Sequence, residues 1–230
     1  MVRGAVGSYR EDWGPARDAF VPIAEFLLTL RRHGILDRQI MAAMEAVPRA
    51  LFLDSDAMGA ALFAERPQPI ACGQLNTPPI IVAEILKALA LTGRERVLDV
   101  GTGSGYLAAV LSMMARHVYS VERFRMLAAV ARTRFEAITS DSITTTIADG
   151  LHGWSEKAPF DRIVTTASAL EPPRSLIEQL TPHGILVMPI GPPDGVQMLT
   201  RFQRVDRSVT PQPIRPVRFV PLIQGKAVRL

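Results

Sequence analysis

The chain has 230 residues, 48% of them hydrophobic, and a formal net charge of +4, which is enough for one domain with additions to bury a full core. No run reaches the roughly 18 apolar residues of a membrane span, and residues 1–15 lack the apolar stretch of a secretory signal peptide. Cys72 is the single cysteine, so no internal disulfide can form and a reducing cytoplasm is the expected setting.

The N-terminal part of the sequence has the periodicity of helices. Apolar residues at helical spacing predict a helix over 18–32. Asp37 is the candidate cap of a second helix over 38–47. Residues 52–63 are expected to mix short helix and turn, and two prolines within 66–69 require an extended backbone.

Pro78 and Pro79 predict the start of a helix over 80–91, because proline fits the first helical turn. From Gly93 onward, strand-like and helix-like segments alternate, which favours a parallel sheet with helices on both faces. The expected fold class is therefore α/β with a doubly wound, mostly parallel sheet. Strands are expected at 96–100, 117–121, 144–148, 160–165, 185–189, 197–204 and 216–221, and helices at 105–115, 125–138 and 173–180.

The most informative motif lies where the first strand of this alternating region ends. Gly101, Gly103 and Gly105 occupy alternate positions, so the backbone there can turn tightly and approach a bound ligand closely. Tyr106 stands where the dinucleotide fingerprint needs a further glycine, which disfavours NAD. A glycine turn of this spacing after an acid-containing strand suits S-adenosylmethionine better.

Acidic residues follow the next two strands. Glu122 ends the strand over 117–121, where a carboxylate can accept both ribose hydroxyls of a nucleoside ligand. Asp149 and Gly150 follow the strand over 144–148, and an Asp there can accept the adenine amino group. Because the carboxyl ends of parallel strands meet in one crevice, these residues are expected to share a site with the glycine turn.

Most of the chain, from about Leu27 to Leu222, resembles the protein-L-isoaspartate (D-aspartate) O-methyltransferase family. The combination of motifs is more specific than any of them alone. The matching segments are Arg31-Arg32-x-Gly34-Ile35, Met44-x-x-Val47-Pro48-Arg49-x-x-Phe52, Pro69-Ile70-x-x-Gly73-Gln74, the glycine turn with Tyr106, residues 118–123, Asp149-Gly150-x-x-Gly153-Trp154, residues 158–161, Pro189-Ile190-Gly191 and residues 217–222.

This resemblance implies a Rossmann-like class I methyltransferase fold in one compact domain. Residues 1–92 would form a helical cap with the active-site loop, 93–195 the cofactor-binding core, and 196–230 the C-terminal strands. The implied reaction transfers a methyl group from S-adenosylmethionine to the free carboxylate of an L-isoaspartyl residue. The ester then closes to a succinimide that can reopen to aspartate, which repairs damaged proteins or peptides. Nucleic acid and membrane partners are not expected, and the protein is expected to be a monomer.

The resemblance also implies the residues of the site. Thr77 falls on the family's active-site serine and is the expected catalytic residue. No catalytic histidine is expected, because a carboxylate is already ionised at neutral pH and acts as its own nucleophile. Neither do the four histidines have the spacing of metal ligands. The expected cofactor-binding residues are Gln74, Leu75, Asn76, Gly101, Thr102, Gly103, Ser104, Glu122, Arg123, Asp149, Gly150 and Thr166.

The loop around Thr77 departs from the family pattern, which usually has Gly-Gln-Thr-Ile-Ser-Gln-Pro. Here Leu75 replaces a hydroxyl residue, Asn76 replaces an apolar one, and Pro78 restricts Thr77 to extended conformations. These changes affect the acceptor side and leave two alternatives. One is a related O-methyltransferase for a different peptide or small-molecule carboxylate, and the other is a cofactor-binding protein without turnover. A nucleic-acid N-methyltransferase is disfavoured, since Glu171-Pro172-Pro173-Arg174 lies late and lacks the required aromatic residue.

The C-terminal segment 201–230 is rich in positive charge, with seven basic residues and one acid, Asp206. Such a segment could attract nucleic acid or acidic peptides. Its basic residues are spread through strand-like sequence, however, which favours a solvated face.

Overall fold

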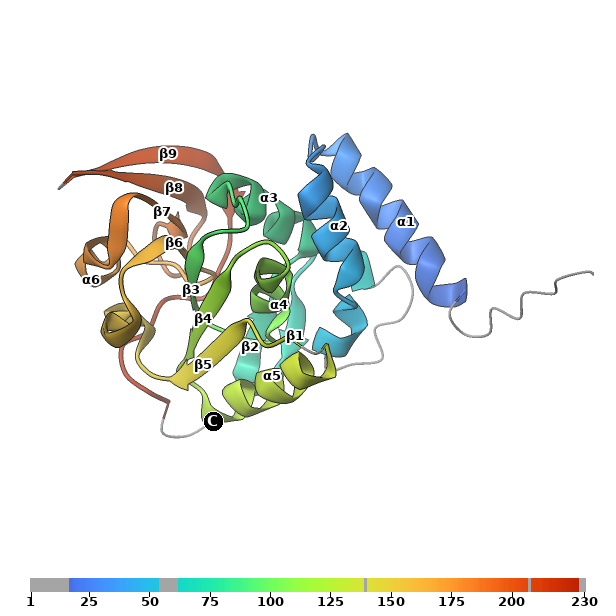
Figure 1. Cartoon of the computed structure of the whole chain (residues 1–230), viewed down its shortest axis with the longest axis horizontal. Helices are drawn as coiled ribbons and strands as arrows, with labels where there is room; N and C mark the ends of the chain where they lie inside the picture. Colours follow the sequence, from blue (N-terminus) through green and yellow to red (C-terminus); the bar gives the residue numbers. More distant parts are fainter. Residues whose placement is uncertain (1–16, 54–61, 139, 207, 228–230) are drawn as a thin grey trace, which may run out of the picture.

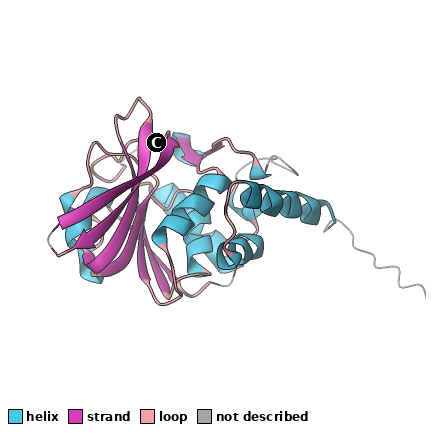
Figure 2. Cartoon of the chain, turned by 90° about the horizontal axis from the view of Figure 1, so that it is seen from above, coloured by secondary structure: helices cyan, strands magenta, loops and turns pink. Residues whose placement is uncertain are grey.

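The computed structural model describes residues 17–53, 62–138, 140–206 and 208–227. Its centre is a seven-stranded sheet of order β5-β4-β3-β6-β7-β8-β9 (Figure 1). The strands from β3 to β7 pair in parallel, whereas β8 and β9 are antiparallel additions. Helices lie on both sides of this sheet (Figure 2). The predicted α/β class with a mostly parallel sheet is confirmed.

The strands of this sheet follow the predicted alternation, although β7 begins five residues earlier than predicted and the last strand is displaced. Their bounds are β3 (Arg96–Val100), β4 (His117–Glu122), β5 (Ile143–Ile147), β6 (Phe160–Thr165), β7 (Leu180–Ile190), β8 (Gln197–Val205) and β9 (Ser208–Val217).

The prediction of a last strand over 216–221 is wrong, because β9 lies earlier in the chain. Three prolines, Pro211, Pro213 and Pro216, lie within it, and proline lacks the N–H that pairs with a neighbouring strand. β9 is an edge strand of the sheet, so a proline nitrogen that faces outward needs no partner strand. A register shift opposite Leu199 and Thr200 accompanies the change in proline spacing from two residues to three.

The helices are close to their predicted positions. Asp37 caps α2 as expected, since its Oδ1 accepts hydrogen bonds from the backbone N–H groups of Gln39 (2.8 Å) and Ile40 (3.3 Å). Gly105 has φ of 92°, which a right-handed helix cannot include, so α4 begins one residue later than predicted. The bounds are α1 (Arg17–Arg32), α2 (Arg38–Ala46), α3 (Pro79–Leu89), α4 (Tyr106–Ser112), α5 (Arg125–Ala137) and α6 (Arg174–Glu178).

Short elements connect these helices and strands. A small hairpin of β1 (Gln68–Ile70) and β2 (Gln74–Asn76) precedes α3 and encloses the turn η3 (Ala71–Gly73). The remaining 3₁₀ turns used below are η1 (Arg49–Phe52), η4 (Gly150–His152) and η5 (Ser155–Lys157).

The two faces of the sheet pack against different helices, because successive strand residues point to opposite sides. Val97 and Val118 join the larger core, to which α1 to α5 contribute. Leu98 and Ile163 face the other way, toward Leu176 of α6. Within the described residues, no helix combines the length and apolar character that crossing a bilayer requires.

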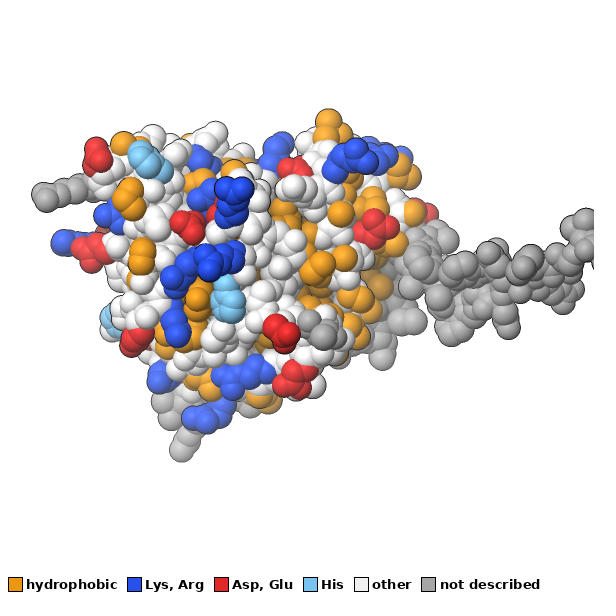
Figure 3. Space-filling view, viewed as in Figure 1, with side chains coloured by type: hydrophobic (Ala, Val, Ile, Leu, Met, Phe, Trp, Pro, Cys, Tyr) orange, Lys and Arg blue, Asp and Glu red, His pale blue; other side chains and the backbone are white. Residues whose placement is uncertain are grey.

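The basic C-terminal segment has structural partners. Arg201 donates to the carbonyl of Ala88 (3.1 Å) at the end of α3, and Arg204 donates to that of Ile177 (3.2 Å) in α6. Arg215 pairs with Glu84 at 2.9 Å. These cations satisfy helix C-terminal carbonyls or a carboxylate. These three arginines are thus partly buried and paired as well as partly solvated, and Figure 3 shows other Lys and Arg side chains interspersed with acidic ones at the surface.

Candidate active site

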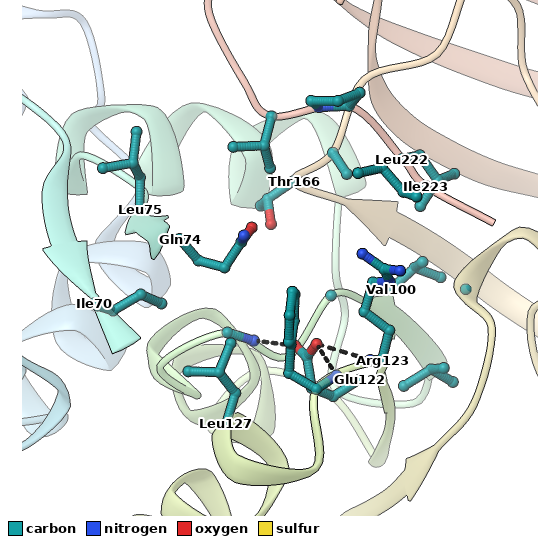
Figure 4. A pocket seen from close by; sticks show the side chains of 18 residues that line it. Ile70, Gln74, Leu75, Val100, Glu122, Arg123, Leu127, Thr166, Leu222 and Ile223 are labelled. Atoms are coloured by element: carbon teal, nitrogen blue, oxygen red, sulfur yellow. Dashed lines mark hydrogen bonds between the residues drawn. The ribbon is translucent and has the colours of Figure 1, made fainter. Parts of the chain in front are cut away.

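The glycine turn follows β3 at the carboxyl ends of the parallel strands. Gly101 has φ of 97° and donates its N–H to the carbonyl of Val121 at 2.8 Å, which fixes the turn against β4. Gly103 has φ of 53°, and both values favour glycine. Both residues line a cavity at this edge of the sheet (Figure 4).

Glu122 lines this cavity, and the residue is 4% exposed. Its Oε2 accepts a hydrogen bond from Gly103 N–H at 2.8 Å. Its Oε1 accepts from the N–H groups of Arg123 (2.7 Å) and Phe124 (2.9 Å), as the dashed lines of Figure 4 show. Backbone N–H groups thus hold the Glu122 carboxylate at the end of β4 through both of its oxygens.

The structure brings eight of the predicted site residues together around this cavity. They come from the β1–β2 hairpin, the glycine turn and the ends of β4, β5 and β6. These eight are Gln74, Leu75, Gly101, Gly103, Glu122, Arg123, Gly150 and Thr166.

Asp149 lies beside the cavity and not in its lining. Its Oδ1 accepts from Leu151 N–H (2.9 Å), and its Oδ2 accepts from Gly225 N–H (2.6 Å). The neighbouring Gly150 does line the cavity, and a Cβ there would lie 2.6 Å from Cγ1 of Val100. A larger residue at position 150 would therefore require the Val100 side chain to shift.

Three other predicted cofactor residues make hydrogen bonds within the protein, and of these Asn76 also lines the second cavity described below. Asn76 is buried and donates from Nδ2 to the carbonyl of Phe52 (3.3 Å). The hydroxyl of Thr102 lies 2.6 Å from that of Ser120. Ser104 accepts from Tyr106 N–H at 3.3 Å through its Oγ. In this structure these side chains hold the loops that surround the cavity.

Thr77, the expected catalytic residue, lines a second and smaller cavity. Leu75 and Thr166 line both cavities, so the two are neighbours. Thr77 is 9% exposed. Arg218, whose side chain is exposed, is the charged residue of this lining among the described residues.

A fully buried carboxyl, Asp99, lies beneath the glycine turn. Its Oδ2 accepts from the hydroxyl of Ser120 at 2.7 Å, and Ser120 in turn contacts Thr102 of the turn. Burial raises the pKa of Asp99 to about 7, with a further increase from the charge of Glu122, while the Ser120 hydrogen bond opposes the shift. The turn therefore rests on a group that titrates near neutral pH.

Sequence reasoning missed the part of the C-terminal segment that closes the first cavity. Residues 220–223 line it together with the apolar side chains of Phe124 and Leu127. Ser168 N–H donates to the carbonyl of Val220, and Leu222 N–H donates to that of Ser168, each at 2.8 Å. Residues 217–222 match the family, which indicates that the segment belongs to the site, but the strand-like pattern of 216–221 predicts only a strand.

The cavity has the chemistry that S-adenosylmethionine requires. Phe124, Leu127 and Leu222 give the cavity apolar surface, while Glu122 and Gln74 add polar groups. Gly150 adds no side chain to this lining, and a Cβ there would collide with the Val100 side chain. In the described part of the chain, no cluster of three or more His, Cys, Asp or Glu residues could hold a metal ion.

Residues 23–227 match the family model described as Protein-L-isoaspartate(D-aspartate) O-methyltransferase. The chain belongs to this family. A protein-L-isoaspartate O-methyltransferase of Paramagnetospirillum magneticum is 44% identical over 204 residues, which cover 88% of this chain and 95% of that protein. The corresponding protein of Maricaulis maris is 45% identical over 203 residues, with 88% and 94% covered.

Two solved structures show the same fold at 24% identity. A protein-L-isoaspartate O-methyltransferase superposes with a TM-score of 0.79 over 86% of this chain and 65% of that chain. The Plasmodium falciparum protein of this kind, in complex with S-adenosyl-L-homocysteine, gives 0.72 over 86% and 97%. The predicted family, fold, enzyme class and cofactor are confirmed, and methylation of isoaspartyl residues is the reaction of this family.

Proposed function

We propose that this protein binds S-adenosylmethionine in the first cavity and methylates the free carboxylate of L-isoaspartyl residues held in the second. The observation that carries this proposal is the adjacency of the two cavities, which share Leu75 and Thr166. A ligand in one is thus next to a ligand in the other. The substrates would be damaged proteins or peptides.

The cofactor would be held by the strand tips. Glu122 would accept the ribose hydroxyls, and Gly101, Gly103 and Gly150 would allow close approach of the backbone. Gln74, Leu75, Arg123 and Thr166 complete the proposed contacts from their places in the lining. Asn76, Thr102, Ser104 and Asp149 would act from behind these groups, through the hydrogen bonds described above.

Thr77 would orient the acceptor. Its hydroxyl and the backbone of the acceptor loop (residues 73–77) would hold the carboxylate, which is ionised at neutral pH and needs no base. When bound, S-adenosylmethionine supplies a methyl group on a sulfonium whose sulfur keeps the bonding electron pair as the ester forms. The protein's contribution is to hold the reacting atoms in line and to exclude water.

We also propose that the protein acts as a monomer in the cytoplasm and without nucleic acid. The single cysteine suits a reducing compartment.

A paired methyl-transfer assay tests the proposal. One peptide carries L-isoaspartate at a single position, and its twin carries ordinary aspartate there. Methyl transfer to the isoaspartyl peptide alone is the expected result. Tight binding of S-adenosylhomocysteine without transfer to either peptide would contradict it.

A further inference from the structure

We infer that Arg49 is a positioning residue that holds the acceptor loop against the start of α4, directly after the glycine turn. Arg49 begins η1 and lines neither cavity. The inference rests on the proposed role of Thr77, and it gives a role to the arginine of the Val47-Pro48-Arg49 motif.

The guanidinium of Arg49 reaches two separate segments from one buried position. The residue is 2% exposed. Its Nη2 donates to the carbonyl of Thr77 at 2.9 Å, and its Nε donates to that of Leu62 at 2.8 Å. Because the donors of arginine form a rigid planar fork, these two bonds fix the place of the Thr77 backbone.

The same guanidinium contacts the cofactor side of the site. Its Cζ lies 4.5 Å from the ring centroid of Tyr106, a geometry in which a cation is attracted to an aromatic face. Tyr106 is 1% exposed and is the first residue of α4, directly after Gly105 of the glycine turn. The Arg49 side chain therefore links the acceptor loop to α4, which directly follows the glycine turn.

A second contact from η1 strengthens this connection. The carbonyl of Phe52, at the end of η1, accepts the hydrogen bond from Asn76, the residue before Thr77. The ring of Phe52 packs edge-on against that of Tyr106, with 5.7 Å between centroids. Two consecutive residues of the acceptor loop are thus anchored to one short turn.

Packing alone does not account for a charged residue here. Burial lowers the pKa of Arg49, although the neighbouring Tyr106 opposes that shift. Within the described residues, neither Nη1 of Arg49 nor the hydroxyl of Tyr106 makes a hydrogen bond of normal geometry. A buried, incompletely paired cation is unfavourable compared with an apolar side chain of similar size. An apolar side chain could not donate the two hydrogen bonds to the carbonyls of Thr77 and Leu62.

The arrangement matters for the reaction because methyl transfer depends on alignment. A displacement of about 1 Å at a reacting group can lower a rate roughly 100-fold. Loss of the Arg49 contacts would allow Thr77 to shift, whereas Glu122 and Gly101 of the cofactor cavity would keep their own hydrogen bonds to Gly103 and Val121. Turnover should then fall more than cofactor affinity.

The test is Arg49→Lys, which keeps the charge but lacks the planar fork. We expect kcat for the isoaspartyl peptide to fall about tenfold or more, with calorimetric affinity for S-adenosylhomocysteine within about threefold of wild type. Arg38→Lys is the matched control, since Arg38 is exposed on α2, and it should leave both quantities unchanged.

Wild-type kcat in folded Arg49→Lys would overturn the inference, as would an equal loss of kcat and cofactor affinity. If Arg49→Lys does not fold, Arg49→Gln, which keeps an N–H donor without the charge, is judged by the same two measurements. An inactive wild-type protein would overturn the proposed function together with this inference. An active wild type with an unaffected Arg49→Lys variant overturns the inference alone.

Discussion

The Glu122 carboxylate, at the end of β4, accepts a 2.8 Å hydrogen bond from Gly103 N–H and so holds the glycine turn that follows β3. A buried carboxylate with backbone donors on both oxygens is strongly fixed in place. Glu122 therefore shapes the glycine turn in addition to its proposed contact with ribose.

Replacement of Glu122 by Ala should weaken cofactor binding. The change removes charge-assisted hydrogen bonds worth about 1.5–3 kcal/mol, so affinity for S-adenosylhomocysteine should fall about tenfold or more. Calorimetric titration measures this directly. Glu136→Ala, an exposed change on α5, is the control. Wild-type affinity in Glu122→Ala would refute the ribose role.

The sequence alone could predict the positions of Glu122 and Gly150 because sheet topology places successive strand ends at one edge. The approximate strand boundaries were enough for that purpose. The resemblance to the family added Gln74 and Thr166, which lie far apart in the chain and meet in the cavity.

Side-chain direction could not be predicted in the same way. Asn76 turns to the carbonyl of Phe52, a contact across 24 residues that no local pattern encodes. Residues 220–223 reach the cavity because the chain folds back onto the backbone of Ser168. Both outcomes depend on tertiary hydrogen bonds and not on the periodicity of the segment.

Arg218 should contribute to acceptor binding. Its exposed guanidinium lines the cavity that contains Thr77, where it would attract an anionic carboxylate. Arg218→Gln should raise the KM for the isoaspartyl peptide several-fold, corresponding to about 1 kcal/mol for a partly exposed charge, with little change in cofactor affinity. Added salt should raise the wild-type KM and have less effect on the variant.

Arg174→Gln is the matched control for Arg218→Gln, because Arg174 is exposed on α6 and lines neither cavity. It removes the same charge from the protein. An equal rise in KM for the two variants would show that Arg218 acts only through net charge, and an unchanged KM in Arg218→Gln would show that it does not contribute.

Asp99 should make stability depend on pH. The pKa of Asp99 is raised to about 7 in the folded protein, whereas an unfolded Asp has a pKa of about 3.9. The folded state therefore binds the proton more tightly, and its contribution to stability is lost as the pH rises from about 4 through 7. Asp99→Asn, which has no charge to bury, should gain Tm relative to wild type as the pH increases from 5 to 8.

Thermal unfolding of both proteins across this pH range provides the measurement for Asp99. The difference in Tm between variant and wild type is the informative quantity, since other groups titrate equally in both. A difference independent of pH would mean that Asp99 does not change protonation in this window.

Thr77 provides the most direct test of the acceptor site. Thr77→Ser keeps the hydroxyl and removes a methyl group, so activity on the isoaspartyl peptide should be retained or raised. Thr77→Val keeps the shape and removes the hydroxyl, so turnover should fall about tenfold or more, as expected for one hydrogen bond of about 1.5 kcal/mol. Cofactor affinity should change little in either variant, because Thr77 lies outside the first cavity. Wild-type turnover in Thr77→Val would remove Thr77 from the mechanism and leave the backbone of the acceptor loop as the carboxylate's binding partner.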